Sequence, residues 1–379
     1  MKRIALLIAV SISMPALSGA QTLRQLADSR GIHFGAAVTL PTGANLAPYE
    51  STLSQQFNTS VCENAMKWQN TEGTRNVFNF TAADAIVDFT LSHGMYMRGH
   101  NFVWHSQVPG WVSNITNRDT LLAVMKNHIN QLAGHYKGKI YEWDVVNEAI
   151  ADGSTGFRTS FWYQRIGADF IDSAFVYAHR ADPNALLVYN DYGAEGMTGS
   201  TATKSTGVYN LVSGLKTRGI PINGVGLQSH FNLNGFDTAS IGANMSRIEA
   251  LGLNISITEL DISTSNTTAN LDAQKANYKS LMTLCVHHPR CKTFITWGVN
   301  DAQSWKGAGA VALLFTGTTT ITAKPAASGI SEAISGVSSV WQVANGRPGV
   351  LRQSHLGRFE LNGSMFDLRG RKLVALPVP

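Results

Sequence analysis

The chain has 379 residues, of which 44% are hydrophobic and 15% are charged, a balance typical of globular proteins and not of disordered ones. Its formal net charge is +5, and residues 338–379 alone supply six basic and two acidic residues, or +4 of that charge. The remainder is close to neutral, which argues against nucleic acid as a partner.

The first twenty residues predict a secretory signal peptide. Lys2 and Arg3 precede an apolar stretch too short to span a bilayer, and small residues at Ser18 and Ala20 precede a cleavage site before Gln21. No later apolar run predicts a membrane-spanning helix. We therefore expect a secreted protein, extracellular or at the cell surface.

Three cysteines fit export into an oxidising compartment. Cys285 and Cys291 are close enough in sequence to predict a disulfide. His287 and His288 between them leave a zinc site as the alternative, although the paired CxxC spacing of a structural zinc site is absent. Cys62 lies in an apolar segment and is interpreted as a buried free thiol.

Short β-like segments alternate with segments of helical period along the chain. The predicted strands cover residues 31–38, 59–64, 96–104, 141–148, 185–192, 224–230, 255–262 and 292–299. Residues 82–94 and 119–136 show apolar positions at helical spacing, with glycine stops after several such segments. Eight strands alternating with helices predict an α/β fold, the (β/α)8 TIM barrel. A doubly wound sheet is the weaker alternative, because no glycine-rich phosphate turn follows the first strand.

Polar and aromatic residues gather where these strands end. In order along the chain they are Glu63, Asn64, His100, Trp104, Asn147, Glu148, Gln228, His230, Glu259 and Trp297. The carboxyl ends of all strands in a (β/α)8 barrel open on one face, where active sites are built. The sequence therefore predicts that six distant segments meet in one cleft.

Carboxyl groups, amides and indoles in one cleft suit the hydrolysis of glycosidic bonds. One carboxyl group of a pair protonates the leaving oxygen while the other attacks the anomeric carbon. Indole faces stack on sugar rings, and amides bind hydroxyl groups. Glu148 and Glu259, each at the end of an apolar strand, are the strongest candidates for this pair.

Six segments of the chain resemble the corresponding motifs of glycoside hydrolase family 10, the retaining endo-β-1,4-xylanases. In the family's order they read "ENAMKW", "GHNFVWHSQVPGW", "WDVVNEA", "GLQSH", "ITELDI" and "TWGVNDAQSW". The resemblance runs from about residue 22 to residue 337. It implies a barrel enzyme whose partners are xylan and xylo-oligosaccharides and which needs no metal or other cofactor.

The resemblance also implies roles for individual residues. Glu148 matches the general acid/base and Glu259 the nucleophile, while His230 with Asp261 would keep the nucleophile ionised and oriented. Asn147 would bond the 2-hydroxyl of the sugar under attack. The remaining expected substrate-binding residues are Glu63, Asn64, Lys67, His100 and Gln107 on the non-reducing side, Gln228 near the acid/base, Trp104, Trp297 and Trp305 as walls, and Tyr192 on the leaving-group side.

Some positions depart from the family pattern or lie outside it. Gly193 follows "NDY" where the family commonly has Asn, and residues 312–327 follow the usual eighth loop only loosely. Both departures concern the leaving-group side of the cleft. His105 is interpreted, with the other histidines of helices and loops, as a solvated or packing residue.

Residues 338–379 have no counterpart in the family and form a predicted basic tail. Alternating apolar and polar residues around "NGS" at 362–364 predict a hairpin. The tail resembles the basic C-terminal sorting tails of some bacterial secreted proteins, which makes it a candidate attachment segment; a solubilising extension is the alternative. For the activity, the alternatives are a β-1,4-glucanase of the same fold and a non-catalytic xylan-binding protein.

Overall fold

A computed structural model describes residues 21–336, 351–353, 359–361, 364–366 and 372–373. The chain divides into two compact units, Met1–Ile334 and Ser335–Pro379. The predicted signal peptide, residues 1–20, lies outside the described residues. None of the helices in the described ranges is long and apolar enough to cross a membrane.

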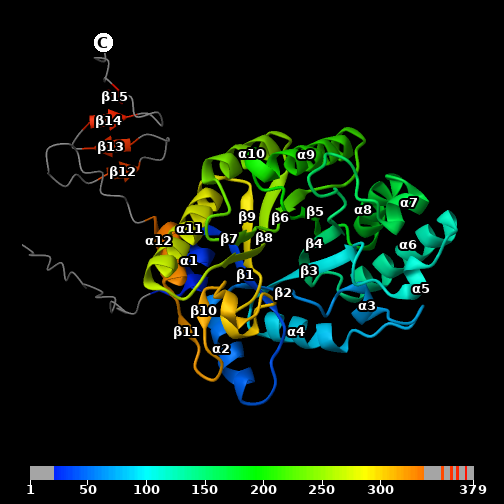
Figure 1. The fold of residues 1–379 in the computed structure, drawn as a ribbon, viewed down its shortest axis with the longest axis horizontal. Coiled ribbons are helices and arrows are strands. Elements are labelled where there is room, and N and C mark those ends of the chain that lie inside the picture. The colour runs from blue at the N-terminus through cyan, green and yellow to red at the C-terminus, as the bar shows by residue number, and fades with distance from the viewer. Residues whose placement is uncertain (1–20, 337–350, 354–358, 362–363, 367–371, 374–379) are drawn as a thin grey trace, which may run out of the picture. The chain divides into compact units, whose positions relative to one another are not determined.

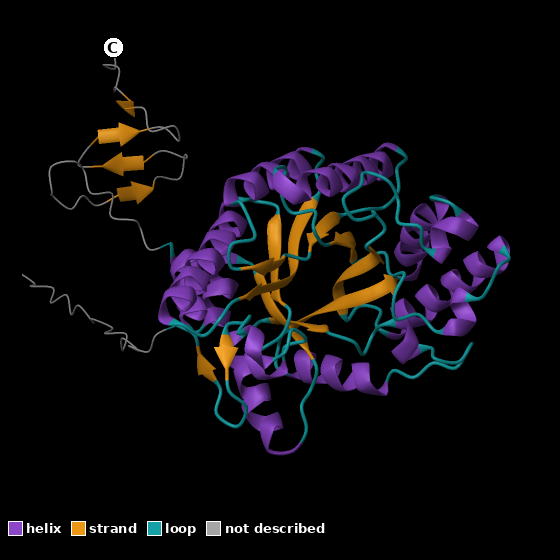
Figure 2. Cartoon of the chain, viewed as in Figure 1, coloured by secondary structure: helices purple, strands orange, loops and turns teal. Residues whose placement is uncertain are grey.

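The first unit is a closed barrel of eight parallel strands, as the sequence predicts (Figures 1 and 2). The strands run in the order β6-β5-β4-β3-β2-β1-β9-β8, and pairing of β6 with β8 closes the ring. They are β1 (His33–Val38), β2 (Thr59–Cys62), β3 (Tyr96–Val103), β4 (Ile140–Asn147), β5 (Leu186–Asp191), β6 (Gly224–Leu227), β8 (Asn254–Ser263) and β9 (Cys291–Thr296).

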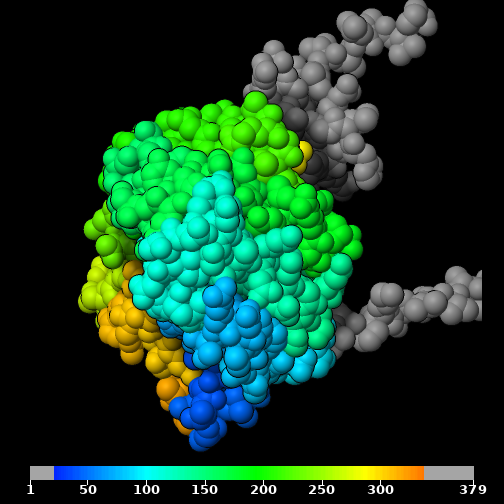
Figure 3. Space-filling view, turned by 90° about the vertical axis from the view of Figure 1, so that its right-hand side faces the viewer, coloured from blue at the N-terminus to red at the C-terminus, as the bar shows by residue number. Residues whose placement is uncertain are grey.

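Helices surround the strands on the outside of the barrel (Figure 2). They are α1 (Leu23–Arg30), α2 (Leu46–Gln56), α3 (Trp68–Thr71), α4 (Thr81–Ser92), α5 (Gly110–Ser113), α6 (Arg118–His135), α7 (Phe161–Ile166), α8 (Asp169–Ala181), α9 (Ala202–Thr217), α10 (Thr238–Ala250), α11 (Thr268–His287) and α12 (Pro325–Ser335). Seen from the right of Figure 1, cyan and green residues of the segment that includes α5 to α8 form a continuous outer surface (Figure 3).

Local sequence explains why these elements form where they do. The side chain of Asn117 caps α6 by accepting from the N–H of Thr120, and apolar residues at helical spacing bury one face of that helix. Strand β3 is buried along its length after Tyr96, as expected for a strand covered on both faces of a parallel barrel.

The sixth predicted strand is interrupted, which the sequence did not predict. Residues 224–230 were expected to form one strand, but β6 ends at Leu227 and a short strand β7 (His230–Asn232) begins after a kink. Ser229 lies in the left-handed region with φ of 64°, and beyond it His230 pairs with Asp261 of β8. The kink turns the chain at the barrel mouth, where it carries cleft residues.

The cysteines adopt the predicted arrangement. Cys285 near the end of α11 and Cys291 at the start of β9 form a disulfide, with Cα atoms 5.1 Å apart. Cys62 is a buried free thiol, and burial raises its pKa far above the ordinary value. The zinc alternative is therefore wrong for Cys285 and Cys291.

The second unit contains four short antiparallel strands in the order β12-β13-β14-β15. They are β12 (Leu351–Gln353), β13 (Phe359–Leu361), β14 (Ser364–Phe366) and β15 (Lys372–Leu373). The predicted hairpin strands β13 and β14 pair on either side of residues 362–363, which lie outside the described residues.

Candidate active site

The residues at the strand ends line one cavity of about 560 Å³. Every predicted catalytic and substrate-binding residue contributes to its wall. The lining residues are Glu63, Asn64, Lys67, His100, Trp104, Gln107, Asn147, Glu148, Tyr192, Gln228, His230, Glu259, Trp297, Trp305 and Lys306. Asp261, predicted as a supporting residue, is fully buried beside the cavity. Lys306 was not predicted.

Glu148 follows directly on β4 and is 9% exposed. Trp104 donates from Nε1 to Oε2 of Glu148 at 2.8 Å, and Gln228 donates from Nε2 to Oε1 at 3.0 Å. Asn147 donates from Nδ2 to the same Oε1 at 3.4 Å. All three donors are neutral side-chain groups.

Glu259 on β8 has a different set of partners. Asn190 donates from Nδ2 to Oε1 at 2.7 Å, and Nε2 of His230 lies 3.3 Å from Oε2. The other ring nitrogen of His230 faces Oδ2 of Asp261 at 2.9 Å, and Trp305 donates to the same oxygen at 2.8 Å. The histidine therefore lies between two carboxylates.

These contacts decide the charge of the pair. Burial is the largest effect and by itself raises the pKa of Glu259, but the hydrogen bond from His230 and the electrostatic interactions with His100 and His230 together outweigh it, and the pKa of Glu259 lies below its usual value. Burial lowers the pKa of His230, but hydrogen bonds to Asp261 and Glu259 raise it to about 9. Glu259 is an anion beside an imidazolium at neutral pH.

Side-chain amides connect the two carboxyl groups. Oδ1 of Asn147 accepts from Nε2 of Gln228 at 3.2 Å and from Nδ2 of Asn190 at 2.9 Å. Gln228 continues to Glu148, and Asn190 continues to Glu259. Asn190, on β5, was not predicted as a site residue, although it is the Asn of the "NDY" segment whose Tyr192 was.

Two lysines in the cavity wall can bind sugar hydroxyls. Lys67 donates to Oδ1 of Asn64 at 3.0 Å, and its Nζ lies 5.1 Å from the ring centre of Trp104. Burial lowers the pKa of Lys67, while the carboxylates of Glu259, Glu63 and Glu148 oppose that effect. Lys306, which the sequence analysis missed, lies over the ring of Trp305 at 4.4 Å.

Buried ion pairs form the floor beneath the cavity. Nδ1 of His100 lies 2.9 Å from Oδ2 of Asp144, and both oxygens of Asp144 accept from Arg98. Burial is the largest effect and raises the pKa of Asp144, but the guanidinium of Arg98 and the interactions with His100 together more than offset this, so the net pKa is lowered. The floor is therefore charged yet paired.

One group in the described part of the chain has the spacing of metal ligands. Atoms of His100, Asp144 and Glu259 all lie within 4.8 Å of one another. Asp144 already contacts Arg98 through both oxygens, and the guanidinium supplies the positive charge that a cation would bring. The arrangement therefore fits a group of side chains whose charges are already paired better than it fits a metal centre.

His105 lies closer to the chemistry than the sequence analysis assumed. Its Nδ1 is 4.0 Å from Oε2 of Glu148, and this nitrogen is buried with no hydrogen-bond partner in the described residues. Burial lowers the pKa of His105. The adjacency to Trp104, which donates to the same carboxyl oxygen, was the signal in the sequence that could have indicated it.

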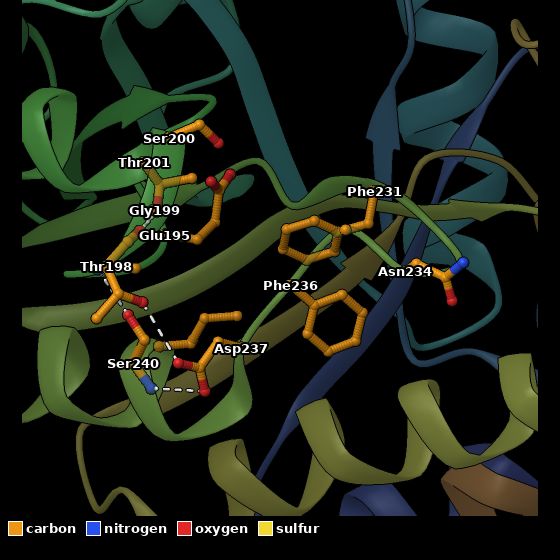
Figure 4. Close-up of a pocket in the computed structure, with 13 residues that line it drawn as sticks. Glu195, Thr198, Gly199, Ser200, Thr201, Phe231, Asn234, Phe236, Asp237 and Ser240 are labelled. Carbon is orange, nitrogen blue, oxygen red and sulfur yellow. Dashed lines mark hydrogen bonds between the residues drawn. The ribbon is translucent and has the colours of Figure 1, made fainter.

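A second cavity of about 300 Å³ lies between the loops that follow β5 and β7 (Figure 4). It contains two carboxyl groups, but both already have partners: Glu195 accepts from the N–H of Ser229, and Asp237 caps α10 by accepting from the N–H groups of Ala239 and Ser240. Both carboxyl groups therefore hold main-chain N–H groups in place, and this cavity contains none of the indole rings that line the first cavity.

The model of glycosyl hydrolase family 10 matches residues 22–333. The chain belongs to this family. The family resemblance and the fold predicted from the motifs are thereby confirmed, and a family 10 protein is a glycoside hydrolase.

Two relatives are similar to this family 10 chain over most of their own length. It is 35% identical over 292 residues to endo-1,4-beta-xylanase B of Thermotoga neapolitana, covering 75% of this chain and 82% of the relative. It is 39% identical over 284 residues to a beta-1,4-xylanase of Dictyoglomus thermophilum, covering 72% and 78%. The crystal structure of xylanase 10B from Thermotoga petrophila with xylobiose superposes with a TM-score of 0.78 and 35% identity, covering 83% and 97%.

Proposed function

We propose that this family 10 protein is a secreted endo-1,4-β-xylanase that hydrolyses internal β-1,4-xylosidic bonds with retention of configuration. The observation that carries the proposal is a pair of buried carboxyl groups with opposite surroundings in one cleft. Glu148 has neutral donors, whereas Glu259 is an anion beside imidazolium. Indoles and amides around them suit a chain of sugar rings.

The reaction follows from these surroundings in two steps. An oxygen of Glu259 attacks the anomeric carbon, the bond to the leaving oxygen breaks, and the proton of Glu148 passes to that oxygen. Water then attacks the anomeric carbon of the glycosyl-enzyme, gives its proton to Glu148, and releases Glu259 as carboxylate. Two inversions give net retention, which requires carboxyl groups about 5–5.5 Å apart.

Xylan is the proposed substrate because the similar proteins are named xylanases and one of them holds xylobiose. A β-1,4-glucan differs by only one hydroxymethyl group per ring, so the comparison that matters is the initial rate on xylan against carboxymethylcellulose. We expect xylan to be cleaved faster and internal cleavage to give xylo-oligosaccharides. Faster cleavage of carboxymethylcellulose would indicate a glucanase, and release of no sugar would indicate a non-catalytic xylan-binding protein.

The two glutamates should respond differently to removal and to azide. Glu259→Ala should be nearly inactive on every substrate. Glu148→Ala should still form the intermediate from an aryl xylobioside whose leaving group needs no protonation, and azide should then restore turnover and give a β-glycosyl azide. Rates and product configuration by NMR check this. An α-azide, or rescue confined to Glu259→Ala, would mean that the two roles are exchanged.

We further propose that residues 1–20 direct export and that residues 338–379 form a tail separate from catalysis, suited to sorting or cell-surface attachment. The disulfide supports an oxidising compartment, because such bonds are rare where thiols are kept reduced. Mass analysis of the protein recovered from the culture medium tests export. Retention of residues 1–20, or recovery only from the cytoplasm, would contradict it.

A further inference from the structure

The main chain at Glu148 has a conformation that few residues with a side chain adopt. Its φ is 59°, in the left-handed region, which is unfavourable for a residue other than glycine because the Cβ atom crowds the main chain. The N–H donates to the carbonyl of Asn190 at 2.9 Å, and the carbonyl accepts from Nε of Arg158 at 3.1 Å. Strained conformations persist only when neighbours impose them, so these two bonds help to set the place of the carboxyl group.

The loop after Glu148 folds back so that Arg158 can make this contact. The N–H groups of Ala149 and Ile150 donate to the hydroxyl of Tyr189 at 3.0 and 3.1 Å. The N–H of Arg158 donates to the carbonyl of Ala149 at 2.7 Å. The start and the end of the loop are thus tied together beside the cleft.

The guanidinium of Arg158 is held in turn by two side chains, those of Asp152 and Tyr192. It donates from Nη2 to Oδ1 of Asp152 and to the hydroxyl of Tyr192, both at 3.0 Å. Asp152 also accepts from Tyr192 at 2.7 Å and from Lys204 at 2.9 Å. We call Asp152, Arg158, Tyr192 and Lys204 the Arg158 clasp.

The Arg158 clasp connects the main chain of Glu148 to Tyr192 in the wall of the cavity. Tyr192 lines the cavity, and Nζ of Lys204 lies 3.5 Å from the centre of its ring on the face of the phenol. Burial opposes the charge of Asp152, but hydrogen bonds from Tyr192, Lys204 and Arg158 lower its pKa well below the usual value. Asp152 is therefore ionised whenever the enzyme is folded near neutral pH, and the clasp stays paired.

We propose that Arg158 is a positioning residue that aims the carboxyl group of Glu148 at the leaving oxygen, and that Asp152 holds Arg158 in place for this task. The inference rests on the proposed function and deepens it. Arg158 touches the main chain of Glu148 and not its carboxyl group, so it acts through geometry. Its loss should affect proton transfer to the leaving group and leave attack by Glu259 unchanged.

Leaving groups of different basicity separate these two effects. Phenyl β-xylobioside needs protonation of its leaving oxygen, whereas 2,4-dinitrophenyl β-xylobioside does not. General acid catalysis contributes about 10²–10⁴-fold, so a displaced acid in Arg158→Gln should lower kcat/KM for the phenyl substrate by roughly 10–100-fold. For the dinitrophenyl substrate kcat/KM should stay unchanged, while kcat falls and azide restores it. Asp152→Asn should show the same pattern to a smaller extent.

A matched control is the ion pair of Arg218 with Asp172, whose two hydrogen bonds are both 2.8 Å and whose residues do not line the cleft. Arg218→Gln should leave both substrates unaffected. Equal losses on the two substrates in Arg158→Gln, or no loss on either, would overturn the proposal. Asp152 is 57% exposed, so Asp152→Asn decides the question if Arg158→Gln does not fold. A wild-type protein that cleaves neither xylobioside would contradict the proposed function instead.

Discussion

His230 shows how one side chain sets the charge of the cleft. It lies between Glu259 and Asp261, and these carboxylates keep its ring charged although burial favours the neutral form. In exchange, the imidazolium keeps Glu259 ionised in a place where burial favours the acid. Opposite charges inside a protein stabilise each other only while all partners are present. Removal of one partner leaves the other as a buried, unpaired charge that destabilises the folded protein.

The stability contributed by His230 should depend on pH with a definite sign. The folded-state pKa of about 9 exceeds the ordinary 6.5, so the folded protein holds the proton more tightly. The contribution is complete below pH 6.5 and is lost as pH rises through 9, a change of about 3 kcal/mol. Urea unfolding of wild type and His230→Gln should therefore show a difference that shrinks between pH 6.5 and 9. A difference independent of pH would show that the ring is neutral.

Close approach of two strands depends on one glycine. Gly99 of β3 pairs with Trp143 of β4, and a Cβ atom at residue 99 would collide with the indole ring. Trp143 is buried and stacks on Phe102 with ring centres 4.2 Å apart, so it has no room to move. His100 follows Gly99 directly, and Asn147 lies further along β4, so strand spacing here positions cleft residues.

Substitution of Gly99 should be far more harmful than substitution of Gly134, an exposed glycine of α6. Gly99→Ala should lower the free energy of unfolding by about 3 kcal/mol or more, because overpacking a dense core forces the strands apart. Gly134 lies in α6 with nothing within 4 Å of a Cβ atom, so Gly134→Ala should stabilise the protein by roughly 0.5–1 kcal/mol. Urea unfolding of both variants measures this. Equal effects would contradict the packing argument.

The whole chain consists of two compact units, and the family match ends at residue 333 within the first. All residues that line the cleft lie between Glu63 and Lys306. The second unit contributes strands of its own, and most of the net charge of the chain lies in residues 338–379. Catalysis and the role of the tail should therefore separate.

A chain that ends at residue 337 tests this separation. It should fold and keep the kcat/KM of the full chain on aryl xylobiosides, because a domain with its own core folds alone. Thermal unfolding and initial rates on both chains check the prediction. A shortened chain that folds but loses most activity would show that residues 338–379 contribute to the cleft.

The residues that face the cleft could be predicted from the sequence because they belong to strand ends. Parallel strands in a barrel open on one face, so Glu63, Asn147 and Glu259 had to converge once eight strands were recognised. The end of a strand can be recognised from the local sequence pattern alone. The six motifs added the order in which these segments follow one another along the chain. The disulfide was predictable for the same reason, since its cysteines are six residues apart.

The contacts between side chains of different strands and loops were decided by the tertiary structure alone. Asn190 joins Asn147 to Glu259, and Arg158 holds the main chain of Glu148, yet neither has a pattern in the sequence that indicates these contacts. Such contacts depend on the pairing register of neighbouring strands and on the path of a loop. Both are set by how the whole barrel packs, because a shift of one residue along a strand would turn each side chain to the other face.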